Sequence, residues 1–372
     1  MSQAEPRCAD EADLGAQGAN GYEIISQVQT WASNNMVPLN AAIEITLKCN
    51  IRCLHCYNFD RDEAKPACDK PELSTEQIFA LMAELRAAGC LFLMFTGGEA
   101  LSDPRLFTFL DRARELNFSV QLLTNGTMLQ PGVAKRLASY ENLQGVSVSL
   151  YGATAEVHDG ITQMNGSWRR TWDGVERLRK LGVIVRVKYI IMRQNAHEVA
   201  AMRAQATERE LPYLMDVNIT TRHDGDRTSL DTRVTLEQLE TLYRGALSNL
   251  VKTDPRPISE EDFYCNCARS NVAITSTGNV QPCMSVPWIA GNVHEQSFSE
   301  IWKTSPVFQR IRGLRMADYA KCAPCGDKDY CRRDRGVAYT STGDYTSADP
   351  FTCATADLNH RLSDERASGV AP

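Results

Sequence analysis

The sequence predicts an α/β protein with a parallel sheet, because six apolar, β-rich runs alternate with helical patterns between residues 40 and 225. Parallel strands joined by right-handed helical crossovers explain such an alternation. A doubly wound sheet and a barrel-like sheet both satisfy the pattern, and periodicity does not choose between them. In either case the active site belongs at the C-terminal ends of the strands. The expected strands are 42–47, 91–95, 118–123, 146–150, 183–191 and 214–219.

The helices between these strands have recognisable ends. Ser74 with Gln77 forms a capping-box pattern, and Gly89 ends the helix that follows. Further helices are expected at 104–116, 133–139, 168–181, 196–208 and 235–251.

Bulk composition narrows the function classes. The chain has 372 residues and a net charge of −6, so it is long enough for one large domain and a smaller one. The negative charge argues against nucleic acid as the main partner. No apolar run is long enough to cross a bilayer, and no basic-then-apolar signal peptide begins the chain. We therefore predict a cytoplasmic protein without a membrane partner, with a loose polar tail over residues 1–20.

Thirteen cysteines are many for a chain of this kind. In a large protein without an export signal, metal binding explains them better than disulfides do. Three lie within eight residues, seven follow residue 264, and three stand apart. The three that stand apart, Cys8, Cys68 and Cys90, are expected to be ordinary side chains. Cys90 is expected to pack as a small hydrophobe next to Gly89.

The first cysteine group is Cys49-x3-Cys53-x2-Cys56, directly after the first expected strand. Three thiolates on one loop can hold three irons of a cubane and leave the fourth iron open to an external ligand. Zinc is the competing interpretation, although structural zinc generally takes four ligands in paired knuckles and catalytic zinc usually includes histidine. His55 lies inside the loop, but an adjacent cysteine and histidine seldom reach the same ion well.

Polar residues also follow the next three strands. Thr96-Gly97-Gly98-Glu99 ends the second strand, Asn125 follows the third, and Ser149 lies at the end of the fourth. Taken alone, the Thr96–Glu99 segment is explained equally well by a strand–helix turn, and Asn125-Gly126 is a common turn sequence. Ser149 is explained by the alternation of polar and apolar residues along a strand. Their shared position at one edge of the sheet is the stronger signal. His158 is expected to have a capping or surface role.

With the aromatic Tyr57 after the third cysteine, these features resemble the radical S-adenosylmethionine (SAM) superfamily. The resemblance implies a partial (β/α)6 barrel and an open iron chelated by the amino and carboxylate groups of SAM. It also implies reductive cleavage of SAM to a 5′-deoxyadenosyl radical that abstracts hydrogen from the substrate. Glu99 would accept hydrogen bonds from the methionine ammonium. The implied ligands of the [4Fe–4S] cluster are Cys49, Cys53 and Cys56, and the implied SAM-contacting residues are Gly97, Gly98, Glu99, Asn125 and Ser149.

The seven late cysteines occupy a region in which the strand–helix alternation has faded. Their spacing, with the segments GNV and SFSEIW between them, resembles the SPASM extension of a subset of radical SAM enzymes. A four-cysteine zinc site in the second half is the alternative that spacing permits. Because the region has few apolar runs, we expect metal to supply much of its folding energy. The resemblance implies one auxiliary cluster on Cys322, Cys325, Cys331 and Cys353, and another on Cys265, Cys267 and Cys283.

The chain departs from the SPASM pattern just after Cys331. Relatives place a further cysteine two or three residues later, where this chain has Arg332-Arg333-Asp334-Arg335. Asp334 is the candidate that would complete the first auxiliary cluster. The alternatives are an open site, a smaller cluster, no cluster, or an Asp334 that pairs with the neighbouring arginines on a solvated loop.

The expected organisation is a tail and lead-in over 1–39, a radical SAM partial barrel over 40–230, a helical linker over 231–258 and a small, loop-rich SPASM-like iron–sulfur domain over 259–372. SPASM members mostly modify ribosomally made peptides or oxidise protein residues. The resemblance therefore implies cross-linking or oxidation of a peptide or protein side chain. The alternative is a radical SAM dehydrogenase or epimerase of a sugar or secondary metabolite.

A zinc- or iron-binding interaction module is the non-enzyme alternative. It would explain the cysteines but not the Gly-Gly-Glu, Asn and Ser at the strand ends. The hypothesis of a radical SAM enzyme implies a reduced flavodoxin or ferredoxin-type electron donor. It also implies a separate peptide-docking protein, because some forty residues before the barrel are too few for a docking domain.

Overall fold

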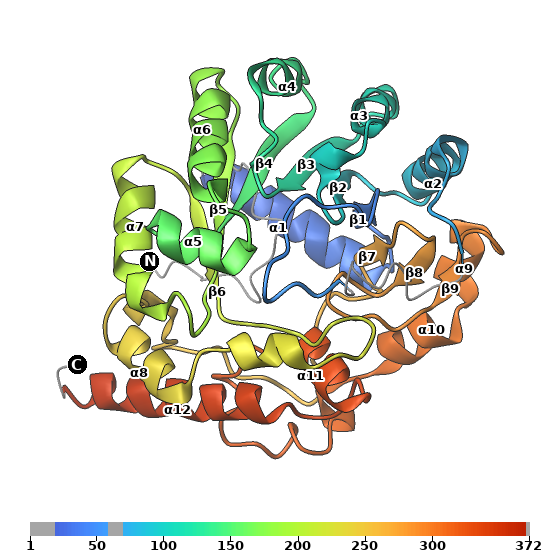
Figure 1. Ribbon diagram of the computed structural model, residues 1–372. Helices are drawn as coiled ribbons and strands as arrows, with labels where there is room; N and C mark the ends of the chain where they lie inside the picture. The colour runs from blue at the N-terminus through green and yellow to red at the C-terminus, as the bar shows by residue number, and fades with distance from the viewer. Residues whose placement is uncertain (1–18, 59–69, 370–372) are drawn as a thin grey trace.

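The computed structural model describes residues 19–58 and 70–369. Six parallel strands form the curved, open sheet of a partial barrel, with neighbours in the order β6-β5-β4-β3-β2-β1 (Figure 1). Each strand overlaps one of the six expected from the sequence, so the α/β class and the partial barrel are confirmed. The strands are β1 (Asn40–Glu44), β2 (Phe92–Thr96), β3 (Ser119–Thr124), β4 (Leu143–Leu150), β5 (Val185–Ile190) and β6 (Tyr213–Asp216).

Helices fan around the outer face of this sheet (Figure 1). Helix α2 (Thr75–Ala87) has the expected capping box, in which the Ser74 hydroxyl accepts from the Gln77 N–H and the Gln77 side chain accepts from the Ser74 N–H. A short helix after β4, α5 (Ala155–Thr162), was not expected; Gly160 weakens its helical pattern, and the Thr154 side chain caps its start. The outer helices are α2 (Thr75–Ala87), α3 (Leu106–Glu115), α4 (Pro131–Leu137), α6 (Ser167–Lys180) and α7 (Val199–Glu208).

Helix α1 (Ala19–Asn34) precedes the barrel and crosses behind it in Figure 1. The loose tail expected over 1–20 lies outside the described residues except for its last two, which begin α1. The same holds for Cys8 and Cys68, whereas Cys90 is fully buried as expected. None of the described helices has the length and apolar character needed to cross a membrane.

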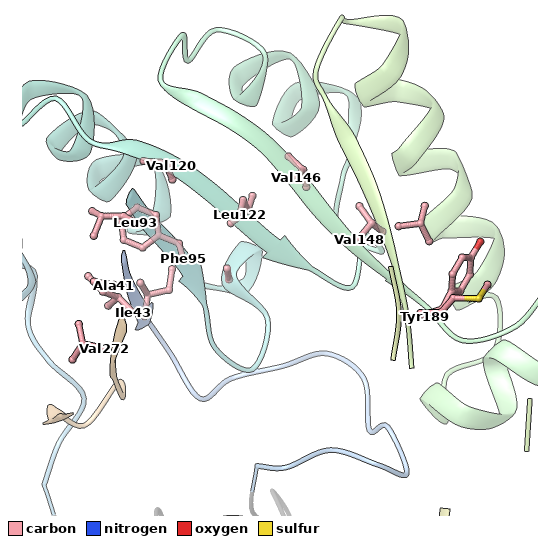
Figure 2. Packing of buried hydrophobic residues seen from close by; sticks show 14 of the residues in the cluster. Ala41, Ile43, Leu93, Phe95, Val120, Leu122, Val146, Val148, Tyr189 and Val272 are labelled. Carbon is pink, nitrogen blue, oxygen red and sulfur yellow. The ribbon is translucent and has the colours of Figure 1, made fainter. Parts of the chain in front are cut away.

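Alternation along the strands separates two faces of the sheet. One face packs against the helices through buried side chains such as Ile43, Phe95, Leu122 and Val148 (Figure 2). Residues between them, among which are Met94, Gln121, Ser149 and Lys188, line a cavity on the concave side. The strands therefore build the core with one set of residues and the site with the other.

The C-terminal region continues the main sheet, which the sequence did not predict. Strand β7 (Asn271–Ile274) pairs parallel to β1, and β8 (Asn279–Gln281) and β9 (Gly291–Asn292) extend the sheet antiparallel. The helix expected over 235–251 is too long: α8 (Leu236–Arg244) stops at Gly245, and a short 3-10 turn follows at Ser248–Leu250.

Helices also make this region less loop-rich than expected. Phe298, Trp302 and Phe308 are buried in the same core as the barrel, and the Trp302 indole N–H donates to the Met36 carbonyl oxygen at 2.8 Å. Apolar packing against the barrel core therefore stabilises this part of the region. The helices are α9 (Phe298–Thr304), α10 (Pro306–Gly313), α11 (Arg335–Thr342) and α12 (Pro350–Ala367).

Candidate active site

A cavity of about 510 Å³ occupies the concave side of the sheet. Its walls include the C-terminal ends of the barrel strands, the Cys49–Cys56 loop, the segment after β6 and the residues around Cys283. The charged side chains among the described lining residues are Lys188, Glu99, Asp216 and Asp334. The cavity also reaches the N-terminal ends of the strands at Asn40, Phe92 and Ser119, so the expected placement of the site at the C-terminal ends stays a prediction.

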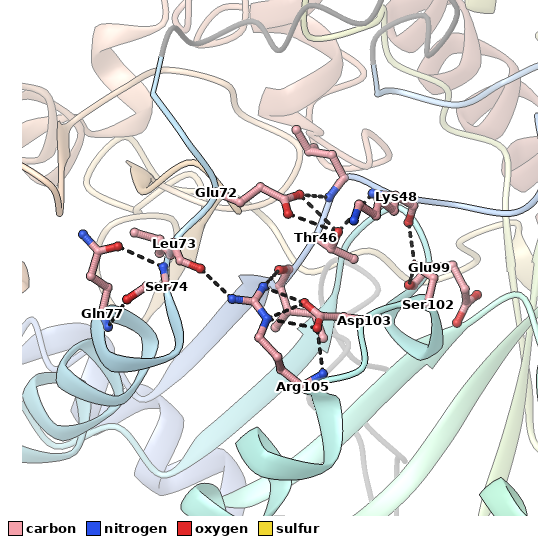
Figure 3. Close-up of polar contacts among 12 residues, drawn as sticks. Thr46, Lys48, Glu72, Leu73, Ser74, Gln77, Glu99, Ser102, Asp103 and Arg105 are labelled. Carbon is pink, nitrogen blue, oxygen red and sulfur yellow. Dashed lines mark hydrogen bonds and ion pairs between the residues drawn. The ribbon is translucent and has the colours of Figure 1, made fainter.

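The backbone that enters the cysteine loop is held by residues that the sequence analysis missed (Figure 3). The Glu72 carboxylate accepts from the Leu47 N–H at 2.6 Å and from the Thr46 hydroxyl at 3.1 Å. Arg105, paired with Asp103 at 2.7 Å, donates to the Ile45 carbonyl at 3.3 Å. No motif marks these residues, because their partners are backbone groups far away in sequence.

The Gly97-Gly98 turn packs directly against the same loop. A Cβ on Gly97 would lie 2.3 Å from the Thr46 carbonyl oxygen, and one on Gly98 would lie 2.4 Å from the Lys48 carbonyl oxygen. Gly97 also has a φ of +144°, which side chains rarely adopt. The Gly98 N–H donates to Thr46 at 2.8 Å. The glycines thus permit a close approach between two backbone segments.

Glu99 is 2% exposed, and its carboxylate is already bonded to the protein. It accepts from the Thr124 hydroxyl and the Asn125 N–H, both at 2.7 Å, and from the Leu101 N–H at 3.0 Å. Burial raises the pKa of the Glu99 carboxyl, and these hydrogen bonds oppose that rise. Glu99 therefore ties the β2 turn to the β3 turn in addition to facing the cavity.

Asn125 connects this turn to the cysteine loop. Its side-chain amide donates to the side-chain oxygen Oδ1 of Asn50 at 2.9 Å and lies 3.9 Å from the Cys49 sulfur. Its own side-chain oxygen accepts from the N–H and the hydroxyl of Thr127 at 3.0 and 2.6 Å. The structure thus brings three of the expected motifs into one hydrogen-bonded unit.

The thiols of the first group lie near Tyr151. Burial, followed by the nearby Cys53, Cys56 and Cys49 sulfurs, raises the pKa of the Tyr151 phenol well above its usual value. Ser149 hydrogen-bonds to Tyr151 from the same strand face. Tyr151 was missed, although its position two residues after Ser149 places it on that face and could have revealed it.

His55 lies in the cavity wall with its ring 4.6 Å from that of Tyr151. Burial, and then the charge of Lys188, lowers the pKa of His55 to about 4, so the ring is neutral at pH 7. Its Nδ1 has no hydrogen-bond partner among the described residues. A buried, unpartnered nitrogen facing a cavity fits a site that binds a polar ligand.

His158 is buried, so the surface alternative of its expected role is wrong. Its Nδ1 accepts from the Tyr151 N–H at 3.1 Å, and burial lowers its pKa to about 4. Glu44, at the end of β1, accepts from the Tyr57 hydroxyl at 3.0 Å, and burial raises its pKa to about 7.

The late cysteines form two neighbouring groups. Burial and then the Cys331, Cys322 and Cys325 sulfurs raise the pKa of Cys353, which places those four thiols together. Cys267 lies beside both Cys265 and Cys283, and hydrogen bonds to these two raise its pKa well above the usual value. No three Cys, His, Asp or Glu side chains in the described part of the chain are arranged to bind a single ion. A cluster requires a different geometry, because each thiolate binds its own iron.

Asp334 lines the cavity and has a structural contact that the sequence did not predict. It is the N-cap of α11, where its Oδ1 accepts from the Val337 N–H at 3.1 Å. Burial, opposed by that hydrogen bond, raises its pKa. Asp334 is therefore not an exposed partner of the neighbouring arginines, and its role as an iron ligand stays a prediction.

Comparison with family models identifies the class of this protein. Residues 43–205 match the radical SAM superfamily, and residues 265–327 match the SPASM iron–sulfur cluster-binding domain. The chain is a radical SAM enzyme with a SPASM domain. A radical SAM domain implies SAM and a [4Fe–4S] cluster, and a SPASM domain implies auxiliary iron–sulfur clusters.

Two curated relatives cover most of the chain. The AdoMet-dependent heme synthase of Methanosarcina barkeri is 27% identical over 340 residues, which are 84% of this chain and 96% of that protein. The mycofactocin maturase MftC of Mycobacterium tuberculosis is 28% identical over 330 residues, which are 82% of this chain and 80% of that protein.

Solved structures share the fold at lower identity. Streptococcus suis SuiB bound to the precursor peptide SuiA has a TM-score of 0.63 at 16% identity, and the match covers 92% of this chain and 83% of SuiB. The enzyme anSMEcpe with AdoMet and the Cp18Cys peptide has a TM-score of 0.68 at 16% identity, with 90% and 99% covered.

Proposed function

We propose that this enzyme modifies a side chain of a peptide or protein, by cross-linking or oxidation, in the cavity inside its partial barrel. Cys49, Cys53 and Cys56 would hold a [4Fe–4S] cluster, which would supply the electron for reductive cleavage of SAM and so the radical chemistry that removes hydrogen from the substrate. Auxiliary clusters on the two late cysteine groups belong to the same proposal.

The observation that carries the proposal is the hydrogen-bonded unit of Glu99, Asn125 and the Cys49 loop. It fixes the cysteine loop against the ends of β2 and β3, and the three cysteines of the loop line the cavity. Gly97 and Gly98, which pack against backbone carbonyl oxygens, line the same cavity. His55, whose Nδ1 has no partner among the described residues, lines it as well. The proposed SAM contacts are Gly97, Gly98, Glu99, Asn125 and Ser149, and we add His55.

A second part of the cavity wall supports a peptide side chain as the substrate. It is formed by residues after β6, such as Thr220 and His223, and by Met284, Ser285 and Asp334. These come from three separate segments of the chain, which gives the wall both polar and apolar contacts for a peptide side chain. A separate docking protein, a flavodoxin or ferredoxin-type electron donor, and a cytoplasmic location are part of this proposal.

The second candidate is a small-molecule substrate. The name of the Methanosarcina relative, AdoMet-dependent heme synthase, favours a haem precursor among such substrates. The charges of the cavity oppose a polyanionic substrate, however. Among the described lining residues Lys188 is the single lysine or arginine, whereas Asp216 and Asp334 are acidic. A substrate with several carboxylates would lack partners there.

The decisive experiment uses the anaerobic holoenzyme with dithionite and SAM. Replacement of Cys49, Cys53 and Cys56 together by Ala should abolish 5′-deoxyadenosine formation while the C-terminal iron is retained. The peptide encoded by a short open reading frame next to the gene should then raise 5′-deoxyadenosine formation by the parent enzyme and lose the mass of two hydrogen atoms. Appreciable SAM cleavage by the triple variant would refute the cluster assignment, and turnover of a tetrapyrrole instead of the peptide would favour the second candidate.

A further inference from the structure

Arg335 is a buried cation located between the two late cysteine groups. Arg335 is 4% exposed and follows Cys331 of one group by four residues. One of its terminal nitrogens donates to the carbonyl of Tyr345, whose hydroxyl lies 3.3 Å from the Cys265 sulfur of the other group. Arg335 is the first residue of α11, where the helix dipole disfavours a positive charge. Some other interaction must therefore stabilise this guanidinium.

The protein contacts of Arg335 are with neutral oxygens. One terminal nitrogen donates to the Tyr264 hydroxyl at 2.6 Å, and the other donates to the carbonyls of Tyr345 and Ser347 at 3.2 and 2.9 Å. The guanidinium also lies over the Tyr264 ring at 3.9 Å. Among the described residues, its Nε–H has no partner. A buried cation that is satisfied by dipoles and keeps one donor unused is suited to a neighbouring anion.

Tyr345 extends this contact to the first cysteine group. Its carbonyl accepts from Arg335, and its hydroxyl lies 3.3 Å from the Cys265 sulfur. The residue is 2% exposed, and its ring packs 5.9 Å from that of Trp288. The distance fits an O–H···S hydrogen bond. Ligands on different irons of a cubane stand farther apart, so the hydroxyl is placed to donate to a bound sulfur rather than to replace one.

We propose that Arg335 and Tyr345 form a hydrogen-bonded cationic bridge between the two auxiliary clusters and raise the reduction potential of the cluster at Cys265, Cys267 and Cys283. A thiolate-bound cluster becomes more negative when it gains an electron. A buried positive charge and a hydrogen bond to sulfur both stabilise that reduced form. The inference rests on the proposed auxiliary clusters and assigns residues that tune them.

The test is an anaerobic dithionite titration of the holoenzyme, followed by electron paramagnetic resonance. Tyr345→Phe keeps the ring and removes the hydroxyl. The iron content should stay constant. At the midpoint potential of the parent enzyme, the ratio of reduced to oxidised cluster should fall about tenfold for one auxiliary signal. This corresponds to a reduction potential lower by about 59 mV. Arg335→Met should lower the potential of the cluster at Cys265, Cys267 and Cys283, and Arg335→Lys, which keeps the charge, should lower it less.

Tyr339→Phe is the matched control, because it removes a phenol hydroxyl from a ring that stacks on Trp288 at 5.5 Å. If the potentials of Tyr345→Phe and Arg335→Met equal those of Tyr339→Phe, the bridge is refuted. Should Arg335→Met fail to fold, Tyr345→Phe still decides. A Cys265→Ala, Cys267→Ala, Cys283→Ala variant with unchanged iron would instead refute the cluster on which the bridge depends, so the two failures are distinguishable.

Discussion

Replacement of Asn125 by Ala tests whether this residue holds the cysteine loop or only contacts SAM. Its side chain makes three hydrogen bonds, one to Asn50 and two from Thr127. At about 1 kcal/mol each, their loss should destabilise the protein by about 3 kcal/mol. The cysteine loop would then lose its tie to β3, so we expect less iron at the first cluster as well as weaker SAM binding.

The assay compares Asn125→Ala with Ser149→Ala under anaerobic conditions. Both are measured for iron content, for SAM affinity and for the midpoint of chemical denaturation. Ser149 hydrogen-bonds to Tyr151 and has no part in the Asn125 contacts described above, so its variant should keep full iron and lose SAM affinity alone. Unchanged iron and unchanged stability in Asn125→Ala would show that the unit does not support the cluster loop, and the reasoning from its hydrogen bonds would be wrong.

Four further predictions follow from individual contacts. Glu99→Gln should weaken SAM affinity about tenfold, because a hydrogen bond to a charged group is worth about 1.5–3 kcal/mol; equal affinity by calorimetry would assign Glu99 to the turn alone. The pKa of Glu44 lies at about 7 instead of 4.5, so its protonated form stabilises the fold at low pH and that contribution is lost as the pH rises through 7. Between pH 4.5 and about pH 7, the parent should lose on the order of 3 kcal/mol of unfolding free energy relative to Glu44→Gln. If the unfolding free energies of the two proteins change in parallel with pH, the assignment is contradicted. Cys325→Ala should remove one cluster's iron and make roughly residues 314–350 sensitive to protease, while α9 and α10 stay protected by the barrel core; equal resistance would indicate a self-sufficient fold. Asp334→Ala should make the first auxiliary cluster labile and Asp334→Cys should retain it with a shifted potential, whereas indistinguishable spectra in all three forms would show that Asp334 is not a ligand.

The local sequence was sufficient to locate the strands, most helices and the motifs of the site. Alternating apolar runs specify strands because side chains point to opposite faces every second residue. The capping box at Ser74 is a contact over three residues, so it was readable directly. The cysteine spacing and Gly97-Gly98 were equally local signals, and the shared edge of a parallel sheet implied that they would meet.

Tertiary structure decided what those residues contact. Glu72 and Arg105 bond to backbone groups that only folding brings near, and no spacing rule reveals such partners. The same holds for β7, a short strand whose place beside β1 depends on pairing across more than 200 residues. Arg335 is the sharpest case. The charged residues on either side of Arg335 predicted a solvent-exposed side chain, but the residue is buried. Burial depends on the whole fold and not only on the neighbouring residues in the sequence.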